Sequence, residues 1–469
     1  MVCRILIFCI VVFANPVFAV DKPSDIKDEI AASIDARESE YAHTAKQIWG
    51  FAEIAFFEVK SSSVLQSKLK EEGFSVEAGV AGLETAFVAT YGKGRPIVGI
   101  LAEFDALPGM SQDAVAERKP LVKDGSGHGC GHNLFGTGSV AAGIAVKDWL
   151  IKSGSVGKIR VYGCPAEEKG GGKVIMAKAG LFDDVDVVLC WHPWDENDAS
   201  PRTTLAVVAV KFRFYGRSSH AAVAPERGRS ALDGVEAMNY MVNLLREHIP
   251  SDSRIHYVIT HGGMAPNIVP EFAEAHYFVR HPKSEVLKGI WSRVVDAAEG
   301  AAQGTGTRLE YEISGGNYSV LINETLAKLM DKNLRLIGGV KYTRDERAFA
   351  EAISQTLGKD SKASGTQEEI QPYELKQGKG SSDVGDVSMI VPTAEVLTAT
   401  WVPGTTAHTW QATAASGMNI GTKGMIVAAK TMAFTAVDVF MNPSYVKQAR
   451  EELEQRRGVD YKYQPLSGW

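Results

Sequence analysis

The pattern of apolar and polar residues predicts a chain in which helices alternate with short buried strands. Residues 24–51 are rich in Ala, Glu and Lys and contain no Pro, which favours helix, and a second helix over 61–72 stops at Gly73. Farther along, apolar runs predict strands at 96–102, 158–163 and 186–190, with a helix over 134–151. Such alternation is typical of an α/β domain with a largely covered central sheet.

The pattern changes between residues 204 and 314. The elements expected there are strands at 205–215, 255–260, 273–280 and 308–313 and helices at 230–247 and 284–302. Their order, β-α-β-β-α-β, is that of a ferredoxin-like α+β module. Because the earlier alternation resumes near Leu321, we expect residues 204–314 to be inserted into a domain made of residues 20–203 and 315–469. A loop at 358–380 and a closing helix at 414–441 complete that domain.

Length and charge narrow the class of protein. A chain of 469 residues is too long for one simple core and predicts two or three domains. Hydrophobic residues make up 45% of the chain and charged residues 23%, which is ordinary for a soluble protein. The net charge of -6 leaves no basic surplus to neutralise phosphates, which argues against a nucleic-acid partner.

The first residues have the pattern of a signal peptide. Arg4 precedes an apolar run at 5–14, and Val17 and Ala19 are the small residues of a cleavage site. We therefore expect residues 1–19 to be removed and the mature protein to be periplasmic or secreted. An uncleaved anchor would need roughly 20 apolar residues. No later segment looks long and apolar enough to cross a membrane, so we expect no stable membrane insertion.

The segment 127–133, Gly-His-Gly-Cys-Gly-His-Asn, is the strongest chemical signal. Cys130 and His132 are donors that zinc prefers, and the interleaved glycines let the backbone fold tightly around an ion. A helix-entry loop with incidental His and Cys is the alternative, but three metal-capable side chains within five residues favour a metal site. Cys130 is one of three cysteines left in the mature chain, an odd number that does not indicate a disulfide framework.

More polar groups follow the predicted strands, the usual place for a site in an open α/β sheet. They are Glu103 and Asp105 after the first strand, Glu167 and Glu168 after the second, and His192 after the third. Acidic residues after strands are common, and a lone histidine such as His192 or His408 is more often structural than a ligand. Beside a metal site, however, one carboxylate of a pair can bind metal while the other takes a proton from water.

Taken together, these segments resemble the family of co-catalytic zinc aminoacylases, deacetylases and carboxypeptidases, in the branch of hippurate hydrolase and auxin-conjugate amidohydrolases. The matching motifs are "DALPG" at 105–109, "GHGCGHN" at 127–133, "PAEE" at 165–168, "SSHAA" at 218–222, the strand-end His192 and "PGTTAHTW" at 403–410. They span almost the whole mature chain. The resemblance implies a zinc-aminopeptidase-like catalytic domain with an inserted dimerisation or lid domain.

The resemblance also implies roles for individual residues. The implied metal ligands are Cys130, His132, Glu168, His192 and His408, holding two divalent ions per subunit, zinc or else manganese. Glu167 is the implied general base, and Asp105 orients a ligand from behind. Asn133 stands beside the ligands where many relatives have Asp. His220 matches a histidine that reaches a neighbouring subunit's site, which implies a homodimer or a heterodimer with a related chain. Asn267, Arg280, Gly404 and Thr405 match positions that contact substrate.

The implied function is metal-dependent hydrolysis of an amide bond in a small molecule, either an N-acyl amino acid, an aminobenzoyl-glutamate-like conjugate or a dipeptide. Three alternatives remain open. One is a dipeptidase for β-alanyl or basic dipeptides. The second is a metal-containing binding protein without turnover, against which Glu167 argues because a binder needs no second carboxylate beside a ligand. The third is a redox enzyme using Cys130, but no partner cysteine lies at C-x-x-C spacing.

Overall fold

The catalytic domain is built on a mixed sheet of six strands in the order β1-β2-β4-β3-β5-β12. The computed structural model describes residues 23–468, so the expected signal peptide at 1–19 lies outside the described residues. The strands are β1 (Ser75–Ala78), β2 (Phe87–Lys93), β3 (Ile97–Glu103), β4 (Gly157–Cys164), β5 (Val187–Trp194) and β12 (Thr393–Ala399). β4, β3, β5 and β12 run parallel, whereas β2 and β1 join one edge antiparallel. Every residue of β3 is buried, so the predicted covered α/β sheet is confirmed.

Two long helices cover one face of this sheet. α4 (His132–Ser153) packs against β3, β4 and β5, and α12 (Asn419–Met441) lies beside α4 and contacts β5 and β12. Contrary to the sequence expectation, both helices are long and apolar enough to cross a membrane by length and composition. Most of their residues are buried inside the protein, however, and their apolar surface forms the core. They are therefore core helices of the catalytic domain.

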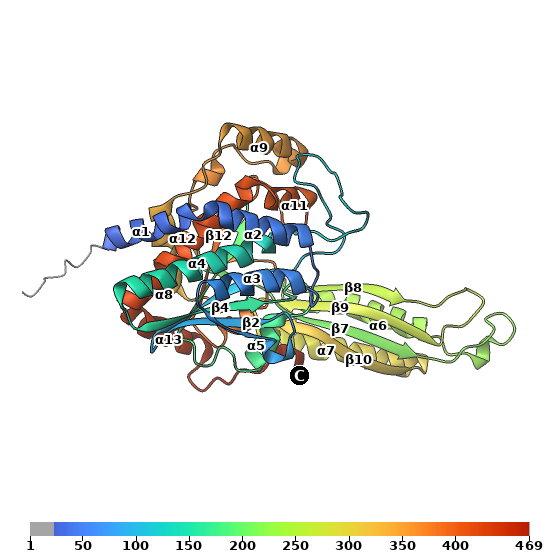
Figure 1. Ribbon diagram of the computed structural model, residues 1–469. Coiled ribbons are helices and arrows are strands. Elements are labelled where there is room, and N and C mark those ends of the chain that lie inside the picture. The colour runs from blue at the N-terminus through green and yellow to red at the C-terminus, as the bar shows by residue number, and fades with distance from the viewer. Residues whose placement is uncertain (1–22, 469) are drawn as a thin grey trace, which may run out of the picture.

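The order of the other elements follows the expected alternation (Figure 1). Further helices of this domain are α1 (Pro23–Ala36), α2 (Glu38–Phe51), α3 (Val59–Glu71), α5 (Gly172–Lys178), α8 (Glu324–Ile337), α9 (Arg344–Leu357), α10 (Val384–Ser388), α11 (Trp410–Ser416) and α13 (Ser444–Arg457). The expected loop at 358–380 is mostly irregular, but its two-residue strand β11 (Lys376–Gln377) pairs with β6 (Arg202–Thr203).

Two helices that the sequence pattern predicted as continuous are interrupted. The first breaks at Arg37, whose φ of -110° and ψ of 9° leave the helical region between α1 and α2. The closing helix breaks between α11 and α12, where Met418 is extended. A Cβ at Gly417 would lie 2.7 Å from the Trp49 ring, so α2 approaches the chain closely there. The break therefore coincides with a close contact to a residue that is distant in the sequence, which local periodicity does not reveal.

The inserted domain is a four-stranded antiparallel sheet with two helices on one face. Its strands β7 (Ala206–Tyr215), β8 (Arg254–His261), β9 (Phe272–His281) and β10 (Arg308–Asn317) pair in the order β10-β7-β9-β8. α6 (Ala231–Leu245) and α7 (Ser284–Thr305) pack against the buried alternate residues of β7 and β9. The β-α-β-β-α-β order matches the expected ferredoxin-like module, although β10 continues past residue 314. The domain extends away from the central sheet (Figure 1).

Candidate active site

The carboxyl ends of the parallel strands bring most of the candidate residues together. Glu103 ends β3, Glu167 and Glu168 follow β4, and His192 lies near the end of β5, two residues before Trp194. The segment 127–133 approaches from the amino end of α4. There, Gly131 has a φ of +75°, and a Cβ at this position would lie 2.8 Å from Pro193. A glycine is therefore needed for the Cys130 turn to come this close to β5.

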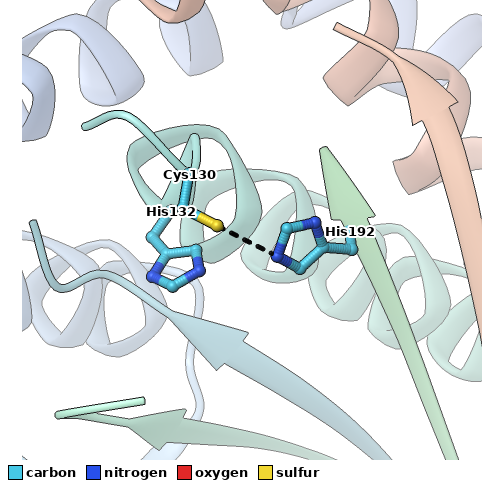
Figure 2. A group of neighbouring side chains, drawn as sticks. All are labelled: Cys130, His132 and His192. Atoms are coloured by element: carbon cyan, nitrogen blue, oxygen red, sulfur yellow. Dashed lines mark hydrogen bonds between the residues drawn. The ribbon is translucent and has the colours of Figure 1, made fainter. Parts of the chain in front are cut away.

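Cys130, His132 and His192 form the first group of metal-capable side chains (Figure 2). Their ligand atoms lie within 4.8 Å of one another. The Sγ of Cys130 is 3.5 Å from Nε2 of His192, and the rings of His132 and His192 meet edge to face. Sulfur and two imidazole nitrogens at this spacing form a donor set that suits zinc.

Hydrogen bonds behind the two histidines fix which nitrogen faces the group. Nδ1 of His132 lies 2.8 Å from Oδ1 of Asp105, and Nδ1 of His192 donates to the carbonyl oxygen of Pro193 at 2.8 Å. Both rings therefore present Nε2 to the shared space. Burial and the nearby His132 lower the pKa of His192 to about 4, so His192 is a neutral donor. Asp105 takes the position behind a ligand that the resemblance implies for it.

A second group consists of Cys130, Glu168 and His408, again with ligand atoms within 4.8 Å. Nε2 of His408 lies 3.4 Å from Oε2 of Glu168. The backbone of His408 has a φ of +63°, which is strained for a residue with a side chain, and its N–H donates to the carbonyl of Gly129 at 2.8 Å. Asp105 also accepts a hydrogen bond of 2.9 Å from the N–H of Glu168. The carboxylate of Asp105 therefore contacts one member of each group.

The structure adds Glu103, which lies two residues before Asp105 but is not among the site residues that the family resemblance implies. Glu103, His132 and Glu167 form a third group within 4.8 Å, and Oε2 of Glu103 lies 3.1 Å from Nε2 of His132. Both of these atoms are buried and have no hydrogen-bond partner among the described residues, and the same holds for Oε1 of Glu168. The position of Glu103 two residues before Asp105, on the same side of an extended chain, was the available signal.

The buried atoms of Glu103, His132 and Glu168 that lack hydrogen-bond partners among the described residues, together with the sulfur, nitrogen and oxygen donors of the cluster, fit divalent cations. Burial, and then Glu168, raise the pKa of the Cys130 thiol well above its ordinary value. Burial and the neighbouring carboxylates of Glu103 and Glu168 raise the pKa of Glu167. Two divalent ions would add positive charge to this cluster of acidic groups and favour their ionised forms.

Asn133, Gly404 and Thr405 are buried. The amide of Asn133 donates to the carbonyls of Ala45 and Ser416, and none of its hydrogen bonds to described residues reaches a candidate ligand. The N–H of Gly404 donates to Asp195 at 2.9 Å, and its φ of +95° requires glycine. The hydroxyl of the buried Thr405 has no hydrogen-bond partner among the described residues.

His220 and Asn267 lie apart from this cluster. They belong to the segments 216–230 and 262–271, which project from the end of the inserted domain that points away from the central sheet (Figure 1). The N–H groups of Ala222 and Val223 lie 3.2 and 3.3 Å from Nδ1 of His220 and donate to it, so the ring proton sits on Nε2. His220 is exposed, so its Nε2–H is available to donate a hydrogen bond to another molecule.

Arg280 lies at the opposite end of β9, next to the catalytic domain. Its Nη1 lies 3.4 Å from Oγ of Ser381, and burial lowers its pKa. Its Nε is buried and has no hydrogen-bond partner in the part of the chain that the structure describes. Among the described residues, no carboxylate lies within ion-pair distance of Arg280. A half-buried guanidinium without a counter-ion is suited to bind an anion.

Comparisons with known proteins agree with this geometry. A family model described as "Peptidase dimerisation domain" matches residues 204–305. The chain is 39% identical to one p-aminobenzoyl-glutamate hydrolase subunit of Escherichia coli, over 90% of this chain and 94% of that protein. It is 30% identical to human Xaa-Arg dipeptidase, over 92% of each chain. The chain belongs to the M20 peptidase family.

A solved structure confirms the fold of this M20 member. The structure of a Bacillus subtilis protein, described as a dinuclear metal-binding peptidase from the M20 family, has a TM-score of 0.60 and 18% identity over 87% of this chain and 99% of that one. The chain is accordingly a metal-dependent M20 amidohydrolase with an inserted dimerisation domain, as the sequence analysis expected. The alternatives of a binding protein without turnover and of a redox enzyme are set aside.

Proposed function

We propose that this chain binds two divalent ions, preferably zinc, and hydrolyses the amide bond that joins an acyl group to an amino acid with a free carboxylate. An aminobenzoyl-glutamate-like conjugate is the leading substrate. The observation that carries the proposal is the pair of candidate ligand groups that share Cys130, with the partly buried Glu167 beside them. The Escherichia coli relative that is named as a p-aminobenzoyl-glutamate hydrolase supports the choice of substrate.

The proposed ligands are Cys130, His132, His192, Glu168 and His408. When bound, the ions supply Lewis acidity, which polarises the substrate carbonyl and makes water more acidic. Glu167 accepts the proton of the attacking water, and the raised pKa of its carboxyl suits it to hold that proton. Glu167 then passes the proton to the departing nitrogen, so that the amine leaves neutral. Glu168 has the different role of a ligand.

Two groups of the inserted domain complete the proposed site. His220 carries its proton on Nε2 and donates a hydrogen bond to the carbonyl oxygen as negative charge develops there. Because the segments that carry His220 and Asn267 project away from the cluster of their own chain, we assign both residues to the site of a second protomer. Arg280 has no ion-pair partner among the described residues. We assign it to bind the carboxylate of the substrate.

A dipeptidase is the second candidate, favoured by the identity to Xaa-Arg dipeptidases of mouse and human. A dipeptide also carries a free carboxylate, so Arg280 serves either substrate. The two candidates differ in the acyl side, which is an aromatic acid in one case and an amino acid with a free amine in the other.

The decisive experiment is a substrate panel with purified, metal-loaded protein. We expect release of p-aminobenzoate from p-aminobenzoyl-glutamate with a kcat/KM at least roughly tenfold above that for dipeptides ending in Arg or Lys. Hippurate and N-acetyl amino acids complete the panel, and chelated protein is the blank. Faster cleavage of basic dipeptides would assign the dipeptidase function instead, and no cleavage of any member would refute the proposed substrate class.

We also propose that the protein is an exported dimer. A homodimer is the simplest assembly, and the alternative is a heterodimer with the other, more distantly related kind of p-aminobenzoyl-glutamate hydrolase chain. Light scattering coupled to gel filtration distinguishes monomer from dimer. Amino-terminal sequencing of the protein from the cell envelope should begin at Val20. A mature chain that retains residues 1–19 would refute cleavage.

A further inference from the structure

Lys173 is a fully buried lysine that joins two buried carboxylates from distant parts of the chain. It lies in the first turn of α5, and its Nζ is 2.7 Å from Oε1 of Glu103 and 2.5 Å from Oδ1 of Asp383. The backbone N–H of Lys173 donates to the other oxygen of Asp383 at 2.9 Å. All three side chains are at most 3% exposed.

Stability alone is a poor explanation for these buried charges. Removing three ionised groups from water costs a large free energy, and apolar replacements of buried ion pairs are often neutral or stabilising. A buried ion pair does, however, fix the relative position of the elements that carry it, because a misplaced charge would be left uncompensated. The ion pairs with Lys173 therefore fix the positions of Glu103 and Asp383.

Glu103 connects Lys173 to the ligand cluster. Its second oxygen, Oε2, lies 3.1 Å from Nε2 of His132, and the Glu167 carboxylate belongs to the same group. Lys173 holds Oε1 and so fixes the direction in which Oε2 points. A single residue, Glu103, therefore separates Lys173 from the cluster at which we propose that the amide bond is cleaved.

Asp383 connects Lys173 to the anion-binding side. It immediately precedes α10 and follows Ser381 and Ser382. The hydroxyl of Ser381 accepts from Arg280 at 3.4 Å, and the carbonyl of Ser382 accepts from Asn317 at the end of β10 at 3.0 Å. The segment 381–388 therefore lies between the ligand cluster and the base of the inserted domain.

We propose that Lys173 is a positioning residue that sets the distance between the ligand cluster and Arg280, and thereby selects substrates whose carboxylate lies one carbon from the amide nitrogen. The proposal rests on the assignment of Arg280 as carboxylate-binding group under the proposed function. Lys173 itself touches neither substrate nor ions. Its effect is transmitted through Glu103 on one side and the segment 381–388 on the other.

The test compares p-aminobenzoyl-glutamate with p-aminobenzoyl-γ-aminobutyrate, which lacks only the α-carboxylate. The wild-type ratio of kcat/KM for these two substrates measures the selection. We expect Lys173→Met to lower this ratio at least roughly tenfold, mainly through a higher KM for the glutamate conjugate, since charged hydrogen bonds are of that strength. Asp383→Asn, which keeps the Lys173–Glu103 pair, should lower the ratio similarly, and the double variant should add little.

Lys147→Met is the matched control. Lys147 is also buried and paired, with Glu72 at 2.9 Å and Asp148 at 2.7 Å, but it lies on α4 away from the segment 381–388. Its loss should change stability and leave the substrate ratio at the wild-type value. A wild-type ratio in Lys173→Met and Asp383→Asn, or an equal fall for both substrates, would overturn the proposal.

Hydrogen exchange separates this proposal from the proposed function. Amides of the segment 381–388 should exchange at least roughly tenfold faster in Lys173→Met and in Asp383→Asn than in wild type, and at the wild-type rate in Lys147→Met. This readout requires no substrate. Unchanged exchange in both site variants would overturn the positioning role, whereas faster exchange without any substrate selection in wild type would refute only the assigned role of Arg280.

Discussion

The Sγ atom of Cys130 lies 3.5 Å from Nε2 of His192, although 62 residues separate them in the sequence. The same sulfur belongs to a group with Glu168 and His408. Cys130 is thus the one residue common to both of these ligand groups. Its loss should affect both sites, whereas loss of His408 should affect one.

Cys130→Ala should therefore reduce bound metal from two ions per chain to well below one, because removing a ligand weakens its site directly. His408→Ala should retain about one ion. Plasma emission analysis of dialysed protein measures both values. Cys164→Ala is the control: Cys164 is buried at the end of β4, its thiol donates to the carbonyl of Tyr162, and its loss should leave two ions bound. Two ions in Cys130→Ala would show that the ligand groups are misassigned.

His220→Ala should lose nearly all activity while keeping its own metal content, because we assign the segment that carries it to the site of the neighbouring protomer. Mixing it with inactive Glu167→Gln should restore activity, since a mixed dimer contains one site with both residues intact. With equal amounts and free exchange, about a quarter of all sites would be complete.

The exposed His248 provides the control for this experiment, and His248→Ala should remain active alone. Mass spectrometry of differently tagged protomers verifies that exchange has occurred. If exchange is complete and no activity returns, His220 acts within its own chain or has no role in the reaction.

Asp386 predicts a pH dependence of stability. Burial raises its pKa from 3.8 to about 7, despite hydrogen bonds from the Tyr463 hydroxyl and the Tyr318 N–H. Since the folded state binds the proton more tightly, this stabilisation is complete below pH 3.8 and is lost as the pH rises to 7. Asp386→Asn should flatten the dependence and exceed wild type above pH 7, by at most about 4 kcal/mol.

Urea unfolding at pH 5 and pH 8 measures this effect. Glu58 and Glu395 also have pKa values raised to about 7 by burial, so the variant should reduce the slope without abolishing it. Asp252→Asn, on the surface, should leave the slope unchanged. A wild-type slope in Asp386→Asn would mean that Asp386 is ionised in the folded protein throughout this range.

Elements with a regular local pattern of buried and exposed residues could be predicted from the sequence. The alternation of buried and exposed residues in β7 and β9 and the amphipathic pattern of α6 and α7 could be predicted, because each face of these elements has one environment. The strands β1 and β2 were missed: β1 is mostly exposed, and only pairing with β4 makes β2 part of the sheet. Pairing between distant segments is not encoded in local periodicity.

The candidate site divides in the same way. Cys130 was a candidate ligand because its motif places a rare donor beside glycines, whereas the ligand role of Glu168 was implied by the family resemblance. Lys173 and Asp383 were missed, because a charged residue in a sequence is normally solvated. Only the fold shows that α5 and the segment 381–388 enclose them together. No sequence motif specifies how the protomers assemble. The sequence therefore does not show in which protomer's site His220 acts.

The central claim, that Glu167 acts on water at a two-ion cluster, is tested most directly by metal titration of chelated protein. Wild type should be inactive without metal and recover p-aminobenzoyl-glutamate hydrolysis on binding two zinc ions per chain. Glu167→Gln should bind the same two ions and remain at least roughly 100-fold less active, because only the base has been removed. Full activity in the chelated wild type, or Glu167→Gln turnover within a few-fold of wild type, would contradict the account.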